Sequence, residues 1–200
     1  MPTRAQRVDP PAEYGILVPE GWFQLPLHPP KARDRALVVL VGRQLAGVDH
    51  VPLVEERLVR ELREEVKRAG RVGGVELYLS LLRLGGVPLA SSLLVSLAPE
   101  AWPGCRTACD LARRLPGAEL VELAGAGEAV RERRTEAPAP ERLMGGTLGT
   151  TTVVYNLPVP TSTAWLTLTF STPMEALAPR MVELFDTVAG TLHWQGREGH

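Results

Sequence analysis

Two cysteines, Cys105 and Cys109, have the residue type and spacing that could support metal binding or redox chemistry. Thiolates four residues apart on a helix could share a soft metal ion or act as a redox pair. A tetrahedral site needs further ligands, and the sequence supplies no second cysteine pair and no nearby histidine. The same spacing makes a mutual disulfide geometrically poor. We therefore interpret both cysteines as residues of a core-facing helix, because cysteine is among the most buried residue types.

Asp49 and His50 are adjacent in the sequence, and such a pair could provide a general base. A base of this kind needs a nucleophile to serve, and the sequence has no Gly-x-Ser-x-Gly motif. The histidines are scattered without metal-ligand spacing: His28, His50, His193 and His200. We expect no enzymatic activity. An enzyme that uses the dispersed residues Asp49, His50 and Cys109 is the weaker alternative.

A glycine-rich segment, residues 144–151, resembles a phosphate-binding loop in composition. Such a loop is followed by a helix and usually carries a lysine, whereas a strand pattern follows here and no lysine is near. The segment is better interpreted as a connection. The sequence thus predicts no cofactor and no bound metal.

Composition describes one ordinary globular domain over residues 1–200, with 44% apolar residues and a net charge of −1. A chain of this length buries roughly 70% of the surface that it exposes when unfolded. Nucleic acid and anionic lipid require a concentrated excess of basic residues, which the charge balance does not provide. We therefore expect neither as a partner.

The start of the chain has no apolar segment of the length that a signal peptide requires, and no run of about eighteen apolar residues follows. We expect no membrane span and a cytoplasmic location, which the few cysteines also suit. Residues 1–12 and 195–200 are expected to be flexible tails of the domain.

The first half of the chain predicts two helices after an extended start. Residues 14–27 read as a short hairpin or a bent strand around a Pro-Glu-Gly turn. Residues 32–46 favour a helix, although their valines would also suit a buried strand. Residues 52–69 have apolar positions every three or four residues and acid-before-base pairs, which predicts an amphipathic helix.

The middle of the chain alternates strands and turns. Residues 75–84 and 87–97 are apolar runs joined by Gly85-Gly86, which predicts a β-hairpin of central strands. A short helix is expected over residues 104–115. Two further strands follow at 118–123 and 128–136, and the charge of the second is typical of an exposed or edge strand.

A long loop over residues 137–149, rich in proline and glycine, follows that charged strand. Loops and exposed charged strands often carry binding residues, so this region is our candidate partner surface. Trp102 lies beside two prolines, and its exposure at a binding edge would extend this partner surface. The candidate residues are Trp102, Arg131, Arg133, Arg134 and Met144.

The end of the chain predicts strands at 152–157 and 165–171, followed by a helix with an apolar stripe. Thr172 and Pro173 match an N-cap and a first helical position. Pro179 predicts either a kink or a short first turn over 173–178, with the main helix beginning near residue 179. Because strands and helices do not alternate strictly, we predict an α+β fold in which helices pack on an antiparallel sheet.

Short motifs at the two ends of the chain carry a family resemblance. The segment from Tyr14 to Trp22, YGILVPEGW, and the closing segments Phe170 to Pro173, FSTP, and Thr191 to Trp194, TLHW, are similar to the two ends of PsbP-like domains, and the chain resembles the actinobacterial type. The resemblance implies an antiparallel sheet sandwiched by helices. It also implies a role in binding other proteins, as for most members of that family.

The sequence as a whole predicts a non-enzymatic protein-interaction or accessory subunit of a bacterial assembly. The alternative is a small-molecule-binding domain with a pocket between the sheet and the helices of residues 29–69. A homo-oligomer is left open. The interpretation rests on one expectation, namely that no ionisable side chains gather around a shared hollow.

Overall fold

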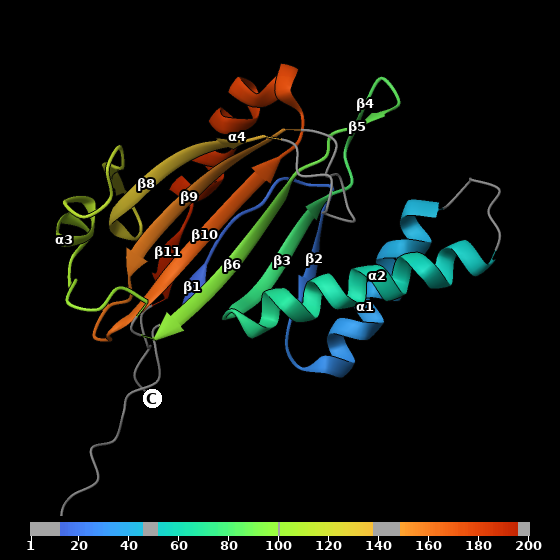
Figure 1. The fold of residues 1–200 in the computed structure, drawn as a ribbon, viewed down its shortest axis with the longest axis horizontal. Coiled ribbons are helices and arrows are strands. Elements are labelled where there is room, and N and C mark those ends of the chain that lie inside the picture. The colour runs from blue at the N-terminus through green and yellow to red at the C-terminus, as the bar shows by residue number, and fades with distance from the viewer. Residues whose placement is uncertain (1–12, 46–51, 100, 138–148, 196–200) are drawn as a thin grey trace, which may run out of the picture.

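The computed structural model describes residues 13–45, 52–99, 101–137 and 149–195. Its centre is a seven-stranded sheet in which every pair of neighbouring strands is antiparallel. The strand order across the sheet is β2 (Trp22–Pro26), β3 (Gly74–Ser80), β6 (Ser92–Pro99), β10 (Ala164–Thr172), β9 (Thr150–Pro158), β8 (Gly127–Glu136) and β7 (Glu119–Leu123). Helices pack on this sheet, so the predicted α+β class is confirmed (Figure 1).

The central strand β10 shows why these residues form a sheet. Leu166, Leu168 and Phe170 are fully buried on one face, while Thr167 and Thr169 are partly exposed on the other. Alternation with period two is what a strand requires when its two faces meet different environments. Burial of each large side chain contributes about 1.5–3 kcal/mol, which fixes the register of β10 against both neighbours.

One face of the sheet carries three helices (Figure 1). Helices α1 (Pro30–Leu45) and α2 (Pro52–Arg71), whose sequence patterns predicted helices, contact each other and cover β2 and β3. The short α3 (Ala108–Ala112) contacts β7 and β8 at the other end. The space under α1 and α2 is filled by a cluster of buried side chains, namely Leu25, Leu27, Leu37, Leu40 and Val66.

The opposite face carries the turn η1 (Glu175–Leu177), the helix α4 (Ala178–Gly190) and a two-stranded sheet of β1 (Glu13–Gly15) and β11 (His193–Gln195). Phe185 of α4 stacks on Phe170 of β10 at a centroid distance of 5.0 Å. These contacts belong to the largest apolar cluster in the described residues. Among the described residues, no helix combines the length and apolar composition needed to cross a bilayer.

A carboxylate ties β1 to the main sheet. Glu76 of β3 accepts hydrogen bonds from the hydroxyls of Tyr14 at 3.2 Å and Tyr78 at 2.8 Å. Its other oxygen accepts from the amide of Gln24 at 3.0 Å. Because Tyr14 lies on β1, these bonds join the small sheet to the seven-stranded one.

Two local expectations are wrong, and a third holds in part. Residues 14–27 form no hairpin, since β1 pairs with β11 and β2 pairs with β3. The strand over 128–136 is exposed at residues 133–136, as one of the two alternatives predicted, although β8 is not the outermost strand, because β7 pairs with its first half. The helix expected over 104–115 is only α3, whose capping box between Thr107 and Asp110 fixes the later start.

Other boundaries follow one of the stated alternatives. The main C-terminal helix begins at Ala178, with Pro179 in its first turn, after the separate turn η1. Thr172 does not cap this helix, because its hydroxyl accepts from the amide of Met174 and donates to the carbonyl of Ala90. The predicted hairpin is confirmed as β3 and β6, with a smaller ribbon, β4 (Arg83–Leu84) and β5 (Val87–Pro88), at its tip.

Candidate functional site

A polar cluster around Arg131 joins four elements. The Nε and Nη2 atoms of Arg131, on β8, donate to the two carboxylate oxygens of Asp186 on α4 at 3.0 and 3.1 Å. Its Nη1 donates to Glu119 on β7 at 3.1 Å. Tyr155 on β9 donates its hydroxyl proton to Asp186 and accepts from Nε of Arg131 at 3.3 Å. The arrangement is bidentate and charge-assisted, which makes it a strong polar contact.

These four side chains surround an open hollow of about 390 Å³, whose remaining walls are Val121 and Leu123. The expectation that no ionisable side chains gather around a shared hollow is therefore wrong. This cluster could not be predicted from the sequence, because Arg131 and Asp186 lie 55 residues apart and meet only when α4 packs on the sheet.

The contacts of this cluster are those of a structural link between elements of the fold. Burial and the hydrogen bond to Asp186 raise the pKa of Tyr155 above its usual value, and Arg131 offsets this only in part. A tyrosine that serves as a base or nucleophile needs the opposite shift. The guanidinium of Arg131 is already shared among Asp186, Glu119 and Tyr155. The cluster therefore fastens α4 to β7, β8 and β9.

The residues of the predicted partner surface lie in three places. Arg133 is exposed on the same face of β8 as Arg131, whereas Arg134 lies on the opposite face and pairs with Glu132. Trp102 is partly buried against the cluster around α3. Met144 lies outside the described residues. The structure thus does not bring Arg131, Arg133 and Arg134 together on one face, and their contact with a partner stays a prediction.

Both cysteines are free thiols. Cys105 is 7% exposed and packs with Ala108, Leu111 and Trp165, in keeping with a core position. In the part of the chain that is described, no group of three or more histidine, cysteine, aspartate or glutamate side chains could hold a metal ion. Asp49 and His50 lie outside the described residues.

The predicted ligand pocket between the sheet and the helices of residues 29–69 lies where the leucine cluster under α1 and α2 is packed. Two hollows over the described residues lie elsewhere. One is the Arg131 hollow, and the other lies beside the turn between β9 and β10. Small-molecule binding at the helices stays a prediction.

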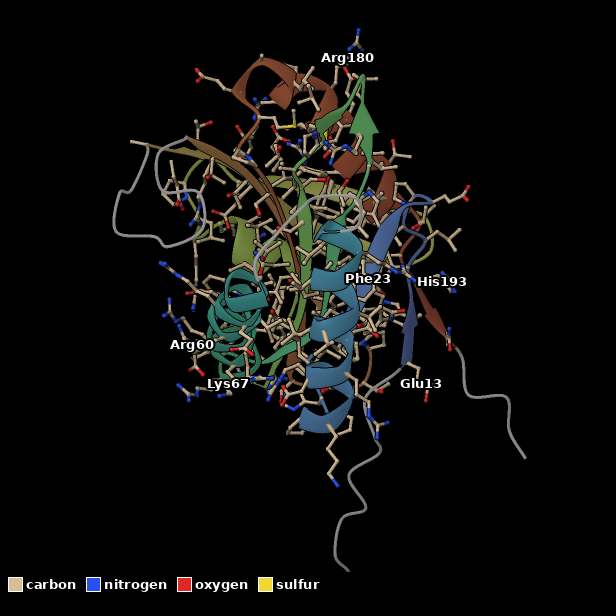
Figure 2. All side chains as sticks on the ribbon, turned by 90° about the vertical axis from the view of Figure 1, so that its right-hand side faces the viewer. Glu13, Phe23, Arg60, Lys67, Arg180 and His193 are labelled. Atoms are coloured by element: carbon tan, nitrogen blue, oxygen red, sulfur yellow. The ribbon has the colours of Figure 1, made fainter. Side chains whose placement is uncertain are left out.

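The outer face of α1 carries apolar side chains that no element of the described chain covers. Val38 and Val39 are 51% and 48% exposed, although Leu37 and Leu40 on the inner face are fully buried. Figure 2 looks onto this side of the molecule, with α1 running along its surface and Phe23 beside it. A helix that is apolar on both faces is usually buried on both.

Basic side chains border these valines. Lys31 and Arg35 are exposed, and with Val38 and Gly42 they follow one another at three- or four-residue spacing, which aligns them along one line of the helix. The guanidinium of Arg43 lies 5.4 Å from the ring centroid of Phe23. The surface made by Lys31, Arg35, Val38, Val39, Gly42 and Arg43 is called the α1 face below.

Sequence reasoning missed the α1 face, although a signal for it exists. Residues 36–41 are apolar without interruption, so a helix there must present apolar side chains all round. The valines of this run suit a helix or a buried strand, and only the helical alternative exposes them.

Comparison with known proteins gives a structural likeness. No protein-family model matches the chain, and no curated protein matches it. The chain is similar to the solution structure of cyanobacterial PsbP (CyanoP) from Synechocystis sp. PCC 6803, with 16% sequence identity and a TM-score of 0.35, over 91% of this chain and 86% of that chain. That protein is cyanobacterial, so the assignment to an actinobacterial type stays a prediction. At this TM-score the likeness says nothing about partner, ligand or activity.

Proposed function

We propose that this protein is a binding domain that engages another protein through the α1 face, as an accessory subunit of a larger assembly. The observation that supports the proposal is the half-exposure of Val38 and Val39 in the middle of α1. Apolar side chains that stand together on a helix face, with a polar border, are characteristic of helix-in-groove or helix-on-helix recognition.

The charges on the α1 face select the kind of partner. Lys31, Arg35 and Arg43 surround the valines, whereas the nearby Asp34 pairs with Arg33 at 3.1 Å and with Arg63 at 3.7 Å. A complementary surface is therefore apolar at its centre and acidic at its border, such as an amphipathic helix with flanking aspartate or glutamate. A second copy that docked through the same face would bring like charges together, which is unfavourable.

Photo-crosslinking in the native host tests the proposal. A benzophenone amino acid at position 39 should capture one protein, identified by mass spectrometry, whereas the same group at position 180 should not. Arg180 is a suitable control because its side chain is 80% exposed and lies on α4, on the opposite face of the sheet.

The captured protein is then purified and its affinity is measured by calorimetry. The double variant Val38→Asp and Val39→Asp should weaken binding by at least about tenfold, since it removes apolar contact and adds charge that repels an acidic partner. Arg35→Glu should also weaken binding, and added salt should do so as well. Val87→Asp is the matched control, because Val87 is 57% exposed but lies on β5.

Absence of any specific product at position 39 would contradict the proposal. So would a product that proves to be a second copy of this chain, or a purified partner whose affinity is unchanged by the two aspartates.

A further inference from the structure

The outer side of β8 is paired over only half of its length. Strand β7 pairs with residues 127–131, and the last pair joins Glu119 to Arg131. Residues 132–136 pair with β9 on the inner side, but no strand in the described part of the chain lies against their outer side. Residues 133–137 are all exposed. The sheet therefore has a step at this edge, formed by the second half of β8.

The backbone of this step can extend the sheet. In an antiparallel ladder, alternate residues direct their N–H and C=O groups toward one neighbouring strand, and the residues between them direct theirs toward the other. Beyond Arg131 the outward groups of β8 face no strand among the described residues. An unpaired edge of this kind is a template for a further strand. Such a strand would lie in line with β7, which limits it to residue 132 and beyond.

The side chains of the step alternate in charge along one face. Glu132, Arg134 and Glu136 share this face, because residues two apart on a strand point the same way. Arg134 pairs with Glu132, and both Glu132 and Glu136 raise the pKa of Arg134. A row of one sign would repel a second copy of itself, whereas a row of alternating sign can pair with its own copy.

Charge and the end of β7 select one register for two such edges in antiparallel order. When Thr135 faces Thr135 of a second copy, Arg134 faces Glu136 of that copy, and the same pair repeats across the axis. A centre at Arg134 would place like charges opposite each other. A centre at Arg133 would place the second copy opposite Arg131, where β7 already lies.

We propose that two copies of this protein pair antiparallel along residues 133–137 of β8, around a two-fold axis at Thr135. The two sheets then form one continuous sheet, and Arg134 of each copy forms an ion pair with Glu136 of the other. The α1 face takes no part, because α1 and α2 cover β2 and β3 at the far side of the sheet from β8 (Figure 1). The dimer therefore does not depend on the partner proposed above and leaves its surface open.

Sedimentation equilibrium of the full chain tests the charge pairs. The unmodified protein should form a dimer with a dissociation constant between about 10 μM and 1 mM. Arg134→Glu should weaken the dimer at least about tenfold, and Glu136→Arg should do the same, because each turns two attractive pairs into repulsive ones. An equimolar mixture of these two variants should regain the unmodified affinity, since opposite charges face each other again in the mixed dimer. This recovery also shows that both variants remain folded.

Glu128→Arg is the matched control for charge reversal. Glu128 is exposed on the same strand and the same face as Arg134, but it lies where β7 covers the edge. The dissociation constant of this variant should equal that of the unmodified protein.

Disulfide formation measures the register. Residues directly opposite in an antiparallel pair have Cα atoms about 4.5–5.5 Å apart, which a disulfide can span. Thr135→Cys should therefore give a covalent dimer on mild oxidation. Arg133→Cys should not, because its two copies would lie about 13 Å apart along the strands. Cys105 and Cys109 are free thiols in every sample, so the unmodified protein provides the background.

A chain that stays monomeric at about 1 mM would overturn the proposal. A dimer whose affinity is unchanged by both charge reversals, or is not restored when the two variants are mixed, would also overturn it. Equal crosslinking of Thr135→Cys and Arg133→Cys would exclude the register centred on Thr135.

Discussion

Two carboxylates in this structure hold tyrosine hydroxyls. Glu76 accepts from Tyr14 and Tyr78, and Asp186 accepts from Tyr155. Burial is the largest cause that raises the pKa of each phenol, and the neighbouring carboxylate raises it further. These are all the tyrosines of the chain. Each therefore keeps its proton in the folded state at a pH where a free tyrosine, with a pKa near 10, loses it.

The folded protein should accordingly lose stability in alkali. A raised pKa in the folded state means that the contribution of each tyrosine to stability is complete below about pH 10 and declines as the pH rises further. The slope is at most about 1.4 kcal/mol per pH unit for each group. In a spectrophotometric titration we expect little phenolate absorbance until the circular dichroism of the fold is lost, and then a joint rise.

A phenolate signal from about a third or more of the tyrosines near pH 10, with the circular dichroism intact, would contradict this prediction. Tyr155→Phe is a useful companion, because it removes one of the three phenols and leaves the two at Glu76 unchanged.

Most helices and strands could be predicted from local sequence patterns. The spacing of residues 52–69 identified α2, and the β-branched runs near the end identified β9 and β10. The pairing of β8 with its neighbour β7 follows the two strands predicted around the glycine turn, whereas the partner of β1 could not be predicted, because β11 lies at the other end of the chain. The same reason hid the Arg131 cluster, whose residues come from separate elements.

The turn from α2 to β3 depends on two glycines. Gly73 has a φ of +88°, which other residues rarely adopt. A Cβ at Gly74 would lie 2.6 Å from the carbonyl oxygen of Ala69 and 2.6 Å from Cδ1 of Leu27. Gly74→Ala should therefore lower the free energy of unfolding by roughly 1–3 kcal/mol, through overpacking against backbone. Urea denaturation measures the change, and an unchanged midpoint would count against the tight turn.

A glycine-to-alanine substitution in α1 should instead raise the free energy of unfolding. Gly42 is exposed within the helix, and a Cβ there would meet nothing within 4 Å. Gly42→Ala should raise the free energy of unfolding by about 0.5–1 kcal/mol, because alanine loses less backbone entropy in a helix. Urea denaturation of Gly42→Ala and Gly74→Ala under the same conditions measures both changes in the free energy of unfolding. A destabilised Gly42→Ala protein would mean that this position is covered in the free protein.

At the scale of the whole molecule, one apolar cluster joins α4, the seven-stranded sheet and the small sheet of β1 and β11. A second cluster joins α1 and α2 to the other face, and a third lies under α3. Strand β10 takes part in the first and the third, through Leu168 and Trp165 respectively. The sheet thus acts as a shared wall between separate cores.

Phe185 tests how far the first core decides the stability of the molecule. It is fully buried and stacks on Phe170. Phe185→Ala should cost about 3–5 kcal/mol, whereas Phe185→Leu, which leaves a smaller cavity, should cost less than half as much. Equilibrium denaturation measures both. Equal, small losses for the two variants would show that α4 is only loosely attached to the sheet.

The pairing of β1 with β11 has a mechanical consequence. Glu13 lies opposite Gln195, so the chain enters and leaves this ribbon at the same end. Tension applied between residues 13 and 195 would load its hydrogen bonds one after another, as in peeling, rather than all together, as in shear. A pulling experiment should release the ribbon at low force, while the seven-stranded sheet still holds its load.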